Sequence, residues 1–210
     1  MHLLDIGCGL GGASRYFAHD RGCRVTGIDL TEEYVHVAGA LARMLRLGEL
    51  VSYKVGSALS LAFSSGTFDG AYMLHVGMNI EDKAKLFAEV RRVLKPKGLF
   101  GIYDVMREAD GELSYPVPWA TTPQMSFVMT AANYRHLLGA AGFEVMEERS
   151  RREFAIEFFR ELRPQVAQTG PPPLGLHIVM GASYPQKVAN MINNLEQGLI
   201  APTEIICRAV

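Results

Sequence analysis

The chain has few cysteines, almost no net charge and no long apolar segment. Its three cysteines, Cys8, Cys23 and Cys207, are odd in number and lack the spacing of metal ligands, so we expect reduced thiols, no metal site and a cytoplasmic location. The 21 basic and 22 acidic residues nearly cancel, which gives no electrostatic basis for binding nucleic acid or an anionic membrane. No apolar run approaches the roughly 18 to 20 residues that a membrane-spanning helix needs.

Segments typical of strands alternate with segments typical of helices along 210 residues, a length that suits one domain. Short apolar runs predict strands at 2–6, 24–29, 51–55, 67–73, 99–105, 143–148 and 200–210. Periodic apolar residues predict helices at 11–20, 31–47, 80–94, 131–141, 152–167 and 184–197. Because parallel strands need crossover connections, this order predicts an α/β fold with a mostly parallel sheet covered on both faces.

Two segments interrupt this alternation. Residues 107–130 contain three prolines and lack a clear period, and residues 152–198 are helical with a break at 170–173. We expect a single domain, residues 1–210, in which both segments cover a substrate site. The last strand follows the helical excursion, which leaves room for an antiparallel orientation.

Glycines lie where the first predicted strand turns into the first helix. Gly7, Gly9 and Gly12 permit a tight turn and let a ligand approach the backbone, beside the unpaired amides of a helix N-terminus. Asp29 ends the next strand, where a carboxylate can accept hydrogen bonds from two ribose hydroxyls. This pattern fits a nicotinamide dinucleotide as well as S-adenosylmethionine. Asp5 favours the second ligand, because a carboxylate repels a pyrophosphate and suits an ammonium and a sulfonium.

Four segments together resemble the class I S-adenosylmethionine-dependent methyltransferase family, over about residues 2–105. They are Leu-Asp-Ile-Gly-Cys-Gly-Leu-Gly-Gly at 4–12, Val-Thr-Gly-Ile-Asp-Leu at 25–30, Phe-Asp-Gly-Ala-Tyr at 68–72 and Arg-Val-Leu-Lys-Pro-Lys-Gly at 92–98. The resemblance implies a Rossmann-like, doubly wound sheet of seven strands in three layers. It also implies the strand order 3-2-1-4-5-7-6, with the last strand antiparallel.

The resemblance implies S-adenosyl-L-methionine as the cofactor and assigns residues to it. The turn with Gly7, Cys8, Gly9 and Gly11 would hold the methionine part, with Asp5 nearby. Asp29 would hold the ribose, Leu30 would pack on adenine, and Ser57 and Ala58 would line the adenine edge, with Leu74 beside them. Many family members have an acid where this chain has Ser57, and an N-terminal helical cap that we expect this chain to lack.

Segments at 74–80, 103–106, 115–120 and 172–177 resemble small-molecule methyltransferases close to sarcosine/dimethylglycine and quinone-biosynthesis enzymes. His75 and Asp104 follow the fourth and fifth strands, where ligands of such sheets bind, so they are the candidate catalytic residues. His75 would be the base if it does more than bond the backbone, and Asp104 would orient an amine or His75 unless it caps a loop.

The candidate substrate-binding residues are Tyr103, Trp119 and His177. Trp119 would form a wall of the acceptor pocket unless it only anchors its loop. Tyr103 would line the pocket unless it packs in the core. His177 would reach the pocket from the excursion or lie at the surface. Cys8 we interpret as packing.

These features predict an enzyme, acting as monomer or homodimer, that transfers a methyl group to nitrogen or oxygen of a small molecule, with carbon a further option. Two alternatives remain open. One is an NAD-type oxidoreductase with the same glycine turn. The other is a protein that binds S-adenosylmethionine without catalysis, which the expected lack of an N-terminal cap suggests.

Overall fold

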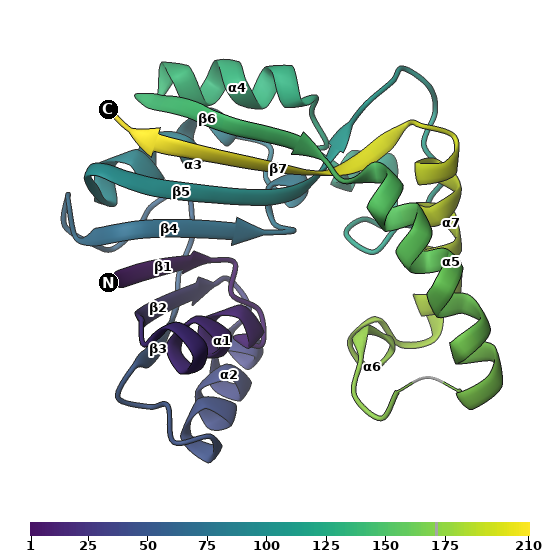
Figure 1. The fold of residues 1–210 in the computed structure, drawn as a ribbon, viewed down its shortest axis with the longest axis horizontal. Helices are drawn as coiled ribbons and strands as arrows, with labels where there is room; N and C mark the ends of the chain where they lie inside the picture. Colours follow the sequence, from purple (N-terminus) through teal and green to yellow (C-terminus); the bar gives the residue numbers. More distant parts are fainter. Residues whose placement is uncertain (171) are drawn as a thin grey trace.

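One seven-stranded sheet runs through the molecule, and helices cover both of its faces (Figure 1). The computed structural model describes residues 1–170 and 172–210. The strands are β1 (His2–Ile6), β2 (Arg24–Asp29), β3 (Val51–Val55), β4 (Phe68–Leu74), β5 (Leu94–Arg107), β6 (Phe143–Ser150) and β7 (Ile200–Ala209). The α-helices are α1 (Gly12–Arg21), α2 (Glu32–Met44), α3 (Lys83–Val93), α4 (Ala131–Ala140), α5 (Arg152–Thr169), α6 (Leu176–Met180) and α7 (Tyr184–Glu196). Short 3-10 helices are η1 (Gly77–Asn79), η2 (Pro123–Met125) and η3 (Gly181–Ser183).

The strand order is β3-β2-β1-β4-β5-β7-β6, as the resemblance implied. The strands β1 to β5 run parallel to one another, whereas β7 runs antiparallel between β5 and β6. The predicted Rossmann-like fold is therefore confirmed, including the antiparallel last strand. Parallel pairing brings the C-terminal ends of β1, β2, β4 and β5 to one edge of the sheet, which is where such folds bind ligands.

Strand alternation divides the core between the two faces of the sheet. Leu4, Ile6 and Met73 belong to a buried cluster with residues of α3 and α4. Leu3 and Tyr72, one position away on the same strands, pack instead with residues of α1 and α2. Each residue of β1 and β4 thus faces either the α1/α2 layer or the α3/α4 layer, which decides its surroundings in the site described below.

Several element boundaries differ from the sequence prediction by a few residues, and two of these differences, at the starts of α3 and β5, have a local cause. The helix predicted at 80–94 begins only at Lys83, because the Asp82 side chain caps it by accepting a hydrogen bond from the Lys85 amide at 2.9 Å. The strand predicted at 99–105 already begins at Leu94, which pairs with Phe68 before the register shifts. Residues 95–98, between the predicted helix and the predicted strand, therefore form an irregular start of β5.

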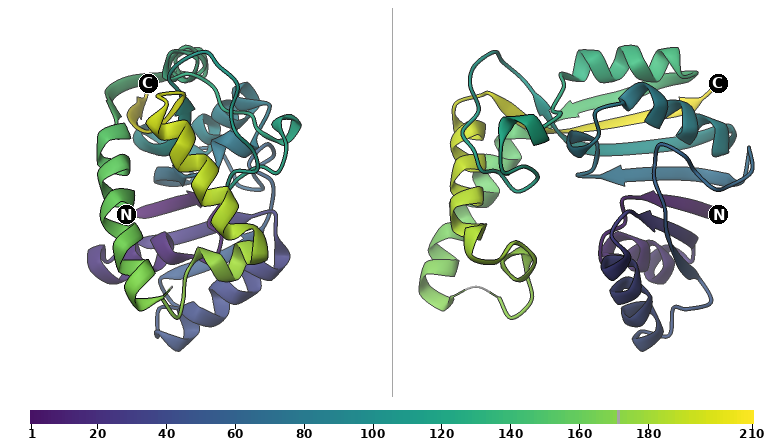
Figure 2. Two further views of the ribbon diagram at one scale, coloured as in Figure 1. Left: turned by 90° about the vertical axis from the view of Figure 1, so that its right-hand side faces the viewer. Right: turned by 180° about the vertical axis from the view of Figure 1, so that it is seen from behind.

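The helical excursion joins the sheet where β6 ends and β7 begins, and its helices extend opposite the C-terminal ends of the parallel strands (Figures 1 and 2). Arg152 joins α5 to the end of α7 by donating to the carbonyls of Leu195 and Glu196, at 2.8 and 3.0 Å. Pro171, which lies in the predicted break of this excursion, is outside the described residues. Within the described part of the chain, no helix is long and apolar enough to cross a membrane.

A buried asparagine attaches the loop 107–130 to the excursion. Asn194 on α7 is fully buried, and its side chain accepts from the Ser114 amide at 2.9 Å and donates to the Ser114 carbonyl at 3.1 Å. The neighbouring Asn193 is half-buried and donates only to the Ser114 hydroxyl. The Asn194 amide therefore satisfies both backbone groups of Ser114 and joins the loop to the excursion.

We expect the substitution Asn194→Ala to lower the free energy of unfolding by about 1–3 kcal/mol, because it leaves a buried backbone N–H and C=O unpaired. Asn193→Ala is the matched control, and its half-buried side chain should cost only about 0.5 kcal/mol. Urea denaturation of both variants measures the difference. Equal losses would show that the two bonds of Asn194 to the Ser114 backbone are not what joins loop and helix.

Candidate functional site

The turn after β1 consists of glycines in left-handed conformations. Gly7, Gly9 and Gly11 have φ values of 68°, 51° and 74°, which L side chains rarely adopt. A Cβ atom at Gly7 would lie 2.4 Å from a methyl group of Val76, and one at Gly11 would lie 2.3 Å from the Tyr53 hydroxyl. A Cβ atom at Gly9 would meet nothing within 4 Å. Two glycines are thus required by close packing within the protein, whereas Gly9 borders open space that a ligand can occupy.

Asp29 lies directly beside this turn. Its Oδ2 accepts a hydrogen bond from the Gly9 amide and its Oδ1 accepts one from the Thr31 amide, both at 2.9 Å. The Asp29 carbonyl accepts a third bond, from the Gly56 amide at 2.9 Å. The structure therefore brings together the two features that the sequence predicted to share one ligand. Each carboxylate oxygen retains a lone pair for a ribose hydroxyl.

Asp5 is buried beneath the turn on the α1 side of the sheet. Only 3% of the residue is exposed, and its Oδ2 accepts from the Ser14 hydroxyl at 2.5 Å. Burial raises the pKa of Asp5 to about 6, although the bond from Ser14 acts in the opposite direction. The carboxylate thus ties the first turn of α1 to β1, and it can act on a ligand above the turn through its charge.

Cys8 is also buried, next to Gly27 of β2, which leaves room for its sulfur. Its position near a helix N-terminus would by itself favour the thiolate. Burial outweighs this effect and, together with the charges of Asp5 and Asp29, raises the pKa of the thiol to about 12. This agrees with the interpretation of Cys8 as a packing residue.

The other predicted cofactor residues surround the turn. Leu30 is 74% exposed directly after Asp29, and Leu74 is exposed at the end of β4. Ser57 is half-buried at the start of the loop after β3, where its hydroxyl accepts from the Leu59 amide at 3.2 Å, and Ala58 packs against the core. Apolar surface and hydrogen-bonding atoms thus lie on both sides of Asp29.

His75 follows β4 in an uncommon backbone conformation. Its φ is 58°, and its amide donates to the Tyr103 carbonyl at 2.7 Å. The rings of these two residues meet edge to face with centroids 4.9 Å apart. His75 is exposed to solvent but surrounded by enough protein that desolvation lowers its pKa, which favours the neutral imidazole. Strained non-glycine residues of this kind cluster at functional sites, so the geometry keeps His75 as the candidate base, with Tyr103 beside it.

Asp104 points away from His75. It follows Tyr103 on β5 and so faces the opposite side of the sheet. There it is fully buried and accepts a hydrogen bond from the Tyr134 hydroxyl at 2.7 Å, and burial raises its pKa to about 6. Its Oδ2 also lies against the backbone of Gly77, where a Cβ atom would come within 2.2 Å. Asp104 thus packs against the segment that follows His75. A direct catalytic role for Asp104 stays a prediction, and these contacts do not favour it.

The structure does not bring Trp119 and His177 into contact with His75 or the glycine turn. Trp119 packs on the cluster formed by Val105, Leu195 and neighbouring residues, and its indole N–H donates to the Ser126 hydroxyl at 2.9 Å. His177 is half-buried on α6 and meets the Tyr184 ring at 6.0 Å. These contacts suit a loop anchor and a packing residue, so their role in binding substrate stays a prediction.

Several supporting residues were missed by the sequence analysis. Tyr53 donates to the Gly11 carbonyl at 3.2 Å, Ser14 bonds Asp5, and Val76 packs on Gly7. Gly27 lies in the middle of β2 and leaves room for the side chains of Tyr53 and Cys8. This glycine was the one signal in the sequence that large side chains pack against this strand. Within the described residues, no group of three or more His, Cys, Asp or Glu side chains is arranged to hold a metal.

Comparison with known proteins finds similarity to methyltransferases. A family model described as a methyltransferase domain matches residues 4–102. The sterol 24-C-methyltransferase of Eremothecium gossypii is 32% identical over 158 residues, which are 71% of this chain and 42% of that protein. The 2-methyl-6-phytyl-1,4-hydroquinone methyltransferase of Synechocystis sp. is 30% identical over 141 residues, which are 67% of this chain and 43% of that protein.

The fold also matches solved structures. Phosphoethanolamine N-methyltransferase 2 of Haemonchus contortus, in complex with S-adenosyl-L-methionine, superimposes with a TM-score of 0.82 at 21% identity, covering 100% of this chain and 48% of that one. The chain spans less than half the length of these three proteins. The match to a methyltransferase domain over residues 4–102, the two relatives and the order of the seven strands show that the chain has the domain and the fold of S-adenosylmethionine-dependent methyltransferases.

Proposed function

We propose that this protein binds S-adenosyl-L-methionine at the Gly9–Asp29 junction and transfers its methyl group to a small molecule. The observation that carries the proposal is the hydrogen bond from the Gly9 amide to Asp29 Oδ2, which sets open backbone beside a carboxylate. A nucleoside whose ribose binds Asp29 lies over this junction, and the exposed Leu30 can cover one face of its base. The family match supports this cofactor over a nicotinamide dinucleotide.

The residues present fit the cofactor. Its ribose would bind Asp29, its methionine part would lie along the amides near Gly9, and Asp5 beneath them would attract its ammonium and sulfonium charges. When bound, S-adenosylmethionine supplies a methyl group on a good leaving group. The protein must then orient the acceptor and exclude water. We assign the orienting to His75 and Tyr103, which face the same edge of the sheet.

The chemical class of the acceptor is the finer part of the proposal. A nitrogen or oxygen nucleophile that arrives protonated needs a base, and a neutral His75 can serve as one. Carbon is a further option, because relatives named sterol 24-C-methyltransferase methylate carbon. The loop 107–130 and the excursion 152–198 would cover the acceptor, since α5 and α7 stand opposite the same edge (Figure 1).

Cofactor binding tests the core of this proposal. Titration calorimetry with S-adenosylhomocysteine and with NADH separates the methyltransferase from the oxidoreductase. A methyl-release assay over amines, phenols, quinols and sterols then separates an enzyme from a protein that only binds the cofactor. Binding of NADH without binding of S-adenosylhomocysteine would overturn the proposal.

We expect Asp29→Ala to weaken binding of S-adenosylhomocysteine at least about tenfold, or about 1.4 kcal/mol. The substitution removes charge-assisted hydrogen bonds to the ribose and also releases the Gly9 amide. Asp20→Ala, at an exposed aspartate near the end of α1, is the control and should leave the affinity unchanged. Unchanged affinity of the Asp29 variant in calorimetry would refute the assignment.

We expect the affinity for S-adenosylmethionine to rise with pH through about 6, because the free protein has Asp5 partly protonated there. A cationic ligand favours the ionised carboxylate, so binding releases a proton where Asp5 of the free protein is protonated. The affinity therefore increases as the pH rises toward about 6 and levels off above that pKa. Calorimetry at about pH 5.5 and about pH 7 measures the change.

The matched control is Asp5→Asn, which cannot ionise but retains an oxygen for the Ser14 hydroxyl. Its affinity should vary with pH only as far as the ligand itself titrates. If wild type and variant show the same pH dependence, Asp5 does not contribute charge to the site.

A further inference from the structure

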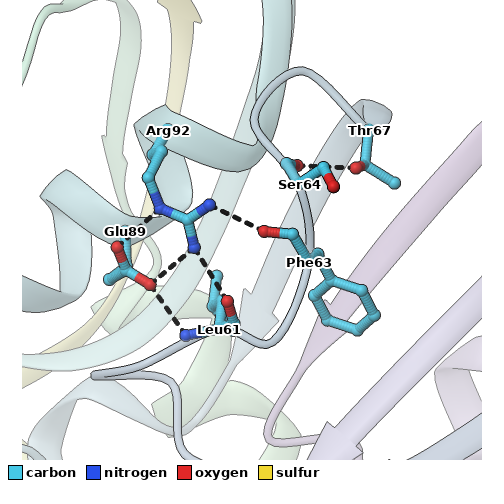
Figure 3. A network of polar contacts seen from close by, with 6 residues as sticks. All are labelled: Leu61, Phe63, Ser64, Thr67, Glu89 and Arg92. Carbon is cyan, nitrogen blue, oxygen red and sulfur yellow. Dashed lines mark hydrogen bonds and ion pairs between the residues drawn. The ribbon is translucent and has the colours of Figure 1, made fainter.

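The loop from Gly56 to Thr67 connects β3 to β4 without helix or strand, and an ion pair on α3 holds its backbone (Figure 3). Glu89 accepts from the Leu61 amide at 2.7 Å. Arg92 donates to the Leu61 carbonyl at 2.8 Å and to the Phe63 carbonyl at 2.7 Å. One turn of α3 thus satisfies three backbone groups of this loop.

The pair is itself rigid. Arg92 donates from Nε to Glu89 Oε1 at 2.7 Å and from Nη2 to Glu89 Oε2 at 2.8 Å, so the guanidinium and carboxylate meet in a two-pronged arrangement. Both side chains are partly sheltered, with 35% of Arg92 and 21% of Glu89 exposed. Charge-assisted, bidentate pairs of this geometry fix orientation better than a single contact.

The position of these anchors connects them to the cofactor site. At the start of the loop, Gly56 is held by its bond to the Asp29 carbonyl. At Leu61, the loop is held by Glu89 and Arg92. Residues 57–60, which include Ser57 and Ala58, are therefore fixed between two anchors. The first anchor is the bond to Asp29, the residue that would bind the ribose.

We propose that the Glu89–Arg92 pair is a positioning element that fixes Ser57 and Ala58 against the base of the bound nucleoside and thereby sets the selectivity for adenine. This inference rests on the proposed function, because a ribose on Asp29 places its base next to the end of β3, which pairs with β2 at Val55 and Asp29. Neither Glu89 nor Arg92 touches the ligand. They act through the backbone between Ser57 and Leu61.

Selectivity for the base is the readout that distinguishes positioning from general stability. S-inosylhomocysteine replaces the adenine amino group with a carbonyl, and calorimetry gives its dissociation constant relative to that of S-adenosylhomocysteine. We expect wild type to favour the adenine compound by about tenfold or more, because a site built to bond a polar edge rejects its mismatch. Arg92→Ala should reduce this ratio by about threefold or more, through loss of both carbonyl anchors.

Two further variants keep the test decisive. Glu89→Gln retains the side-chain volume and an acceptor for the Leu61 amide but weakens the bond to Arg92, so it should reduce the ratio less while remaining folded even if Arg92→Ala does not. Arg135→Ala breaks a comparable ion pair with Glu148 that joins α4 to β6, away from this loop, and should leave the ratio unchanged.

The outcomes separate this inference from the proposed function. If wild type does not bind S-adenosylhomocysteine, the proposed function fails and the inference fails with it. If wild type binds it but lacks base selectivity, or if Arg92→Ala and Glu89→Gln retain the wild-type ratio, only the inference is overturned. An equal loss in Arg135→Ala would also overturn it, because the effect would then be general destabilisation.

Discussion

The constraint on which the site depends is the convergence of three backbone amides on Asp29. The amides of Gly9, Thr31 and Gly56 belong to the turn after β1, the start of α2 and the loop after β3, and all three donate to this one residue. The Gly56 amide donates to the backbone carbonyl, which continues the pairing of β2 with β3, whereas the Gly9 and Thr31 amides donate to the carboxylate and would otherwise need water. The same residue therefore orders the surroundings of the proposed nucleoside site and provides its carboxylate.

Alternation of side chains along the strands explains why neighbouring candidates have different environments. Tyr103 and Asp104 are adjacent, yet one meets the His75 ring and the other lies under the η1 backbone against Tyr134. Asp5 lies on the α1 side, beneath the glycine turn. Two buried carboxylates with raised pKa values thus support the two halves of the edge from opposite faces of the sheet. Exposed groups such as His75 remain for direct contact.

The sequence predicted most of the fold and the proximity of Gly9 and Asp29, for a physical reason. Strands and helices follow from local periodicity, and Gly9 and Asp29 had to meet because parallel neighbouring strands end at one edge. The orientation of Asp104 could not be predicted in this way, because β5 is buried on both faces near its end and its residues lack polar alternation. Glu89 and Arg92 are three residues apart on a helix, which alone indicates only an exposed ion pair. Their bonds to a loop almost thirty positions earlier depend on tertiary structure.

The two halves of the edge are stabilised by different kinds of interaction. The half proposed to bind the cofactor is stabilised by hydrogen bonds from backbone amides to the Asp29 side chain, so a change of this side chain disturbs several segments at once. The excursion is attached by side-chain contacts, namely the bonds of Asn194 to Ser114 and the packing of Ala155 and Leu195 with Val105 and Ile200, and much of its surface is exposed, including Phe154 and Phe158. If the excursion covers the acceptor as proposed, its exposed residues can be exchanged at little cost to the sheet. Differences in acceptor between members of this family would then arise in the excursion, while the junction of turn and carboxylate stays the same.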